Sequence, residues 1–215
     1  MKCLVSFLCA LCIFLFNTAA LGAADPAKGK QDSLSPTTAS SFGSKADWEY
    51  AKAQLDLLKL GDSMKAHSNG LHEIMRDIGP MLSDVEDAVL STVAARIIEE
   101  SRIVLIYQYL LLQLSISIDE SEKPHYYDKL REIIHFAKSK LDSNVGALLN
   151  VYSRIQSNAV LVQIDKSRDI MKDSSKLLNT ALGMLESMKQ YCEVTPPEHR
   201  VKIRPSGEAQ ESPAK

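Results

Sequence analysis

Apolar residues recur at intervals of three and four along most of residues 46–192, the pattern of helices that bury one face. The first such stretch covers residues 46–78 and ends at Gly79-Pro80, a pair that stops a helix. Its repeating positions are Tyr50, Ala53, Leu57, Leu60, Met64, His67, Leu71, Ile74 and Ile78. We therefore expect one long bundle helix here.

A second helix is predicted from Ser83 to about Ile118. Ser83 and Glu86 have the spacing of a capping box, in which each side chain accepts a hydrogen bond from a free backbone N–H. Residues 119–122 are polar and form the next loop. Pro124 then falls in the first turn of a third helix, where its missing N–H removes no hydrogen bond.

Residues 124–192 carry two apolar patterns that do not join in phase. One continuous helix would place Asn158 and Asp165 in the core. A turn near Ser157-Asn158 removes this conflict and gives four helices of about 33–36 residues; a turn at residues 142–146 is the alternative. We favour the first because antiparallel helices of equal length cover each other's apolar faces. The expected fold is all-α, an antiparallel four-helix bundle.

The run Ile103–Ile118 contains no charged residue. Strand alternation fails at residues 110–112, and a helix of this length covers about 24 Å, short of the roughly 30 Å of a bilayer core. Gln108 and Gln113 also interrupt the run. We interpret it as part of a buried helix, with a strand and a membrane span as the alternatives.

At about 100° per residue this run has two nearly opposed apolar stripes, with Gln108 and Ser115 in one gap between them. The first stripe is Val104, Tyr107, Leu111, Leu114 and Ile118, and the second is Leu105, Tyr109, Leu112 and Ile116. A helix in a simple bundle needs only one buried stripe. Two stripes predict burial on both sides, either by more of this chain or by a partner. The second stripe is our candidate interaction surface.

The two ends of the chain differ from its middle. Residues 1–24 combine Lys2, the apolar stretch Leu4–Phe16 and small residues up to Ala24, which predicts a secretory signal peptide and export to a periplasm or the outside; an uncleaved anchor is the alternative. Residues 25–45 predict a disordered linker and residues 193–215 a flexible tail, because neither has enough apolar area to fold alone. The bundle domain is then residues 46–192.

Of the four cysteines, only Cys192 lies outside the predicted signal peptide. The mature chain therefore has no internal disulfide. In an oxidising compartment a single cysteine is a free thiol or forms an intermolecular disulfide, and we keep both interpretations for Cys192.

Few features suggest chemistry. The formal charge is −2 without a basic patch, which argues against nucleic-acid binding. Glu132 and His135 have the Glu-x-x-His spacing of di-iron bundles, but Glu132 falls about 160° from the apolar position Ile134, so no metal or other cofactor is expected. No catalytic signature occurs. His67 lies on an apolar stripe, either as a neutral core histidine or as a pH-sensitive position.

These observations predict an exported, non-enzymatic helical bundle that acts through protein–protein interaction or self-association. Membrane contact is not expected after signal cleavage. One alternative is a small-molecule or metal-binding bundle with a site around His67 and the tyrosines Tyr107 and Tyr109. Another is a membrane-associated protein that uses the run Ile103–Ile118.

Overall fold

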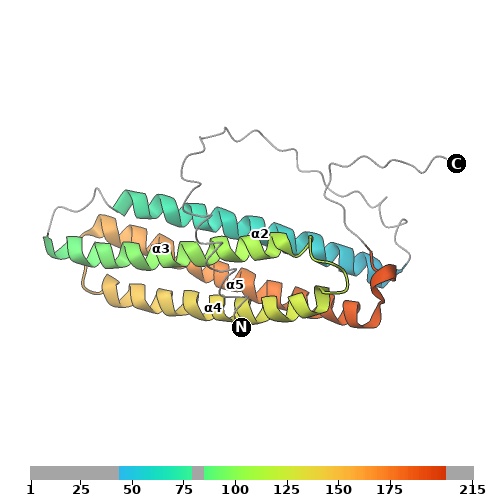
Figure 1. Ribbon diagram of the computed structural model, residues 1–215. Coiled ribbons are helices and arrows are strands. Elements are labelled where there is room, and N and C mark those ends of the chain that lie inside the picture. Colours follow the sequence, from blue (N-terminus) through green and yellow to red (C-terminus); the bar gives the residue numbers. More distant parts are fainter. Residues whose placement is uncertain (1–43, 79–84, 202–215) are drawn as a thin grey trace, which may run out of the picture. The chain divides into compact units, whose positions relative to one another are not determined.

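Four long helices make up most of the part of the chain that the structure describes (Figure 1). The computed structural model describes residues 44–78 and 85–201. The elements are α2 (Lys45–Ile78), α3 (Val85–Leu114), α4 (Lys123–Tyr152), α5 (Asn158–Val194) and the short 3-10 helix η3 (Pro197–His199). No strand occurs in these two ranges, and the prediction of an all-α four-helix bundle is confirmed.

The helices run up and down in sequence order. Both α2 and α4 pack against α3 and α5, while α3 and α5 touch only slightly across the diagonal. Two hydrogen bonds between α2 and α5 show the antiparallel direction: Asp47 pairs with Tyr191, and His67, further along α2, pairs with the earlier residue Ser174. Figure 1 shows the four helices lying lengthwise beside one another.

The predicted helix boundaries agree with the structure to within a few residues. The helices contain 34, 30, 30 and 37 residues. The third helix continues through residues 142–146 and ends at Tyr152, so the turn near Ser157 is confirmed and the alternative turn is wrong. α3 ends at Leu114, four residues before its expected end at Ile118. Ser83, the predicted N-cap of α3, lies outside the described residues.

The core of α2 follows a repeat of seven residues. Its fully or nearly buried positions are Tyr50, Leu57, Met64, Leu71 and Ile78. A seven-residue repeat keeps one side of a helix facing its neighbours along the whole bundle. The same spacing returns on α5 in Ile164, Met171, Leu178, Leu185 and Cys192. This repeat explains why the sequence alone placed these two helices well.

The core stripe of α3 differs from the expected one. Leu105 and Leu112 have no exposed surface, so the stripe assigned to a partner lies inside the bundle of a single chain. Gln108 and Ser115, expected in a gap between stripes, are also buried, at 2% and 6% exposure. Ser115 Oγ donates to the Leu112 carbonyl oxygen at 2.6 Å, which provides a partner for its hydroxyl inside the core.

The segment after α5 packs against one end of the bundle. Arg200 is 7% exposed, and its guanidinium donates hydrogen bonds to the backbone oxygens of Glu120, Cys192 and Thr195. The predicted tail therefore begins later than residue 193, since residues up to Arg200 contribute to the folded unit. The predicted signal peptide and almost all of the predicted linker lie outside the described residues.

Candidate functional site

The second stripe of the uncharged run does not form the outer surface of α3. Besides the buried Leu105 and Leu112, it includes Tyr109 and Ile116, which are only partly exposed. The ammonium of Lys65 lies 5.1 Å from the ring centroid of Tyr109, so a cation from α2 covers part of this ring. Leu105 and Leu112 are therefore not accessible to a partner on the folded bundle.

The outward side of α3 is apolar instead. Ile103 is 55% exposed, Leu110 38% and Leu114 44%. Leu110 follows the core residue Leu105 by five positions, a rotation of about 140° that turns its side chain away from the bundle axis. Tyr107, one turn before Leu110, is half-buried on the flank that faces α4.

Phe136 of α4 extends this surface across the α3–α4 interface. Its side chain is 73% exposed, an unusual state for a large aromatic residue. Lys140, one turn later on the same side of α4, forms a 2.8 Å ion pair with Glu100 of α3. Since α3 and α4 are antiparallel, Phe136 lies near the level of Ile103, one turn after Glu100. We call Ile103, Tyr107, Leu110, Leu114 and Phe136 the apolar patch.

The charged groups of α3 next to the apolar patch precede Ile103 and are paired. Residues 103–118 carry no charge, so the patch has no ionised group from α3 itself. Glu99 and Arg102, just before it, pair with each other at 2.6 Å, and Glu100 pairs with Lys140. These pairs neutralise the charges nearest to Ile103. Residues 103–114 of α3 therefore contribute apolar and uncharged side chains alone to this surface.

His67 lies in a partly buried position between α2 and α5. Its Nδ1 is 2.8 Å from Ser174 Oγ, and that hydroxyl donates to the Ile170 carbonyl oxygen at 2.7 Å. Because the serine proton is used in the second bond, Nδ1–H must donate in the first. Burial lowers the pKa of His67, and the nearby carboxylate of Asp173 opposes part of this shift.

Cys192 lies in a tyrosine-rich cluster at the bundle end. Its thiol is 2% exposed and donates to Tyr50 Oη at 3.5 Å, while the hydroxyls of Tyr50 and Tyr127 are 3.2 Å apart. The rings of Tyr50 and Tyr191 stack at 4.2 Å. Burial raises the pKa of the Cys192 thiol and raises that of Tyr127 to about 12. The thiol therefore sits in a position that disfavours its reactive thiolate form.

An intermolecular disulfide through Cys192 requires this end of the bundle to open. Arg200 holds the following segment against the Cys192 carbonyl oxygen, and the thiol itself faces the core. The intermolecular disulfide stays a prediction. In the closed arrangement the sulfur is not on the surface.

The structure offers no arrangement for metal chemistry within the described ranges. Glu132 is exposed and pairs with Lys129 at 3.0 Å, and His135 is also exposed. Across residues 44–78 and 85–201, no three or more His, Cys, Asp or Glu side chains converge as a metal site. Nor does any helix of these ranges have the length and hydropathy to cross a membrane.

The sequence pattern alone did not reveal the exposed residues of the patch or the buried polar ones. Ile103 and Leu110 belong to an apolar run without a predicted outward direction. A helical projection anchored on Ile98 and Leu105 as core positions would have placed Ile103 and Leu110 outside.

The chain matches no family model, no curated protein and no solved structure.

Proposed function

We propose that this protein is a non-enzymatic helical bundle that binds another protein, or a second copy of itself, through the apolar patch. The observation that carries the proposal is the exposure of Ile103, Leu110 and Leu114 on a stretch of α3 without charged residues. Contiguous apolar surface of this kind marks interaction sites on soluble proteins. Each such side chain gains roughly 25 cal/mol per Å² when a partner covers it.

Phe136 strengthens the proposal because it comes from a different helix. Aromatic residues are enriched at the centres of protein interfaces, where they provide a large contact area at low cost in side-chain entropy. With the ring of Phe136 beside the outward residues of α3, the surface is two helices wide. A partner can then bury a compact area rather than one narrow stripe.

The test compares Leu110→Glu with Val162→Glu by light scattering of the purified chain. Val162 is 46% exposed on α5, which lies diagonally across from α3, so it is a matched control. An oligomer that Leu110→Glu dissociates and Val162→Glu leaves intact supports self-association through the patch. An oligomer that both variants leave intact contradicts it.

If light scattering shows that the chain is a monomer, the proposed partner is a different protein, and a second experiment is needed. A photo-crosslinking benzoylphenylalanine at position 110, expressed in the native cells, should give a defined adduct, and the same group at position 162 should give none. If the wild-type chain is monomeric and position 110 also gives no adduct, the proposed function is wrong.

We also propose that the protein acts after export, on the basis of the apolar and small residues in positions 1–24. N-terminal sequencing of protein collected outside the cells tests this. A first residue between positions 21 and 25 agrees with the proposal, and an intracellular chain that keeps Met1 contradicts it.

A further inference from the structure

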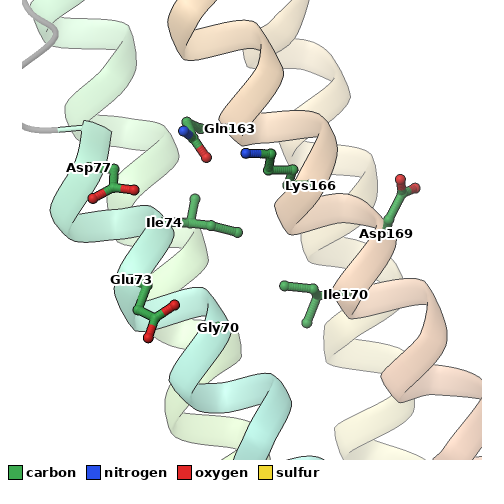
Figure 2. A pocket seen from close by; sticks show the side chains of 8 residues that line it. All are labelled: Gly70, Glu73, Ile74, Asp77, Gln163, Lys166, Asp169 and Ile170. Carbon is green, nitrogen blue, oxygen red and sulfur yellow. The ribbon is translucent and has the colours of Figure 1, made fainter.

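A groove between α2 and α5 lies far from the apolar patch, towards the end of the bundle where α2 stops at Ile78. It is open to solvent on one side and has a volume of about 440 Å³, which is large enough for a small molecule. Its walls come from Gly70, Glu73, Ile74 and Asp77 of α2 and from Gln163, Lys166, Asp169 and Ile170 of α5. Figure 2 shows these residues on the two facing helices.

The two walls of the groove carry opposite charges. Glu73 and Asp77 are one helical turn apart on α2, and Lys166 extends from α5 into the gap between the helices (Figure 2). Within the part of the chain that the structure describes, neither Glu73 nor Lys166 forms an ion pair. The carboxylate of Asp169 points away from the gap. The α2 wall therefore carries two carboxylates, of which that of Asp77 also lies 3.9 Å from Arg76, and the α5 wall carries the ammonium of Lys166 beside Asp169.

The floor between the walls is apolar and depends on a glycine. Ile74 is 7% exposed and points towards α5, and Ile170 points towards α2 (Figure 2). A Cβ atom at Gly70 would lie 3.2 Å from Ile170 Cδ1, tighter than an ordinary contact. The absence of a side chain at Gly70 lets Ile170 lie close to α2, and the two isoleucines form one apolar strip.

Gln163 adds a polar group to the α5 wall of the groove. The residue as a whole is 9% exposed, and its side-chain amide is directed into the gap (Figure 2). Its amide atoms are not among the buried polar atoms that lack a partner, so they face the solvent in the groove. An amide both donates and accepts hydrogen bonds, and can therefore exchange this water for a polar group of a ligand.

We propose that this groove binds a small zwitterionic molecule with an ammonium group and a carboxylate at opposite ends of a short apolar body. The ammonium pairs with Glu73 and Asp77, and the carboxylate pairs with Lys166 and accepts a hydrogen bond from the Gln163 amide. The apolar body lies over Ile74 and Ile170. The axes of packed helices are about 8–10 Å apart, which suits a chain of a few methylene groups between the two charges.

Three probes of equal carbon number separate the contributions of the walls: ε-aminohexanoate carries both charges, hexylamine only the ammonium and hexanoate only the carboxylate. Binding is followed by NMR through the side-chain amide of Gln163 and the backbone amide of Gly70. We expect saturable shifts with ε-aminohexanoate and an affinity about tenfold weaker for each singly charged probe, the effect of one charge-assisted contact. Absence of saturable shifts with ε-aminohexanoate overturns the proposal.

Variants of exposed residues assign each end of the probe. Glu73→Gln combined with Asp77→Asn should weaken ε-aminohexanoate and hexylamine by about tenfold. Lys166→Met keeps the aliphatic stem and should weaken ε-aminohexanoate without weakening hexylamine. Glu49→Gln, exposed near the other end of α2, is the matched control and should change nothing. Equal affinities in all variants overturn the proposal, because binding would then not use these charges.

Discussion

Asn144 of α4 donates a 2.9 Å hydrogen bond to Ser101 Oγ of α3 inside the core. Both residues are buried, at 4% and 0% exposure, and the serine hydroxyl also lies 3.4 Å from Met171 Sδ of α5. These contacts connect α3 to both α4 and α5 inside the core. Polar core positions of this kind can fix the register of packed helices, since a shifted register leaves them without partners.

Ser101→Ala should lower the free energy of unfolding by about 1–3 kcal/mol, because it leaves the Asn144 amide buried without this acceptor. The measurement is urea-induced unfolding of both single variants and of the double variant Ser101→Ala/Asn144→Ala. The double-variant cycle should give a coupling of about 0.5–1.5 kcal/mol. A coupling of zero would show that the hydrogen bond does not stabilise the fold.

Leu112→Ala should lower the free energy of unfolding by about 2–5 kcal/mol, because Leu112 is fully buried and its loss leaves a cavity. Leu110→Ala is the matched change two residues earlier, and we expect an effect below about 1 kcal/mol for this outward side chain. Chemical denaturation followed by circular dichroism measures both. Similar losses for the two variants would contradict the assignment of core and surface on α3.

The stability of the bundle should fall in mild acid because of His67. Burial lowers the folded-state pKa of this imidazole below its ordinary value of 6.5, so the unfolded chain binds a proton more readily. The free energy of unfolding therefore decreases as the pH drops through 6.5, and this loss is complete below the folded-state pKa. Above that window His67 is neutral in both states and contributes no pH dependence.

Unfolding in urea across this pH range, with His67→Gln as comparison, measures the effect. Below pH 6.5, the free energy of unfolding should fall less in the variant than in the wild-type chain. NMR titration of the His67 ring provides the control. A His67 midpoint above 6.5 would contradict the predicted direction.

The Cys192 thiol should react slowly with a thiol reagent at neutral pH, since it is buried and its pKa is raised. Arg200→Ala removes the guanidinium that holds the following segment over Cys192, and should speed the reaction by about tenfold or more by favouring local opening. Arg154→Ala, an exposed change elsewhere, is the control. Equal rates for wild type and Arg200→Ala would show that Arg200 does not protect the thiol.

Gly146→Ala should raise the free energy of unfolding by about 0.5–1 kcal/mol, because glycine is a poor helix former and a Cβ there meets nothing within 4 Å. Gly70→Ala is the contrasting change, since its Cβ would lie 3.2 Å from Ile170 Cδ1. Thermal unfolding compares the two. A destabilised Gly146→Ala would contradict the uninterrupted course of α4 at this position.

The sequence by itself determined the number, order and approximate ends of the helices. Repeats such as Leu57, Met64 and Leu71 are local properties of the chain, as is the proline in the first turn of α4. The break in phase near Ser157 also follows from spacing alone, because an apolar stripe that changes face cannot remain buried in one straight helix. These features need no knowledge of the neighbouring helices.

Only the tertiary structure decided which side of α3 faces inward. Over Ile103–Ile118 every direction is apolar or neutral, so hydrophobicity does not distinguish the core side of Leu105 from the outward side of Leu110. The choice depends on groups more than 40 residues away, such as Asn144 for Ser101 and α2 for the contacts of Leu112. These partners determine which side chains of α3 are buried. The sequence of α3 alone does not show which neighbouring helices will cover it.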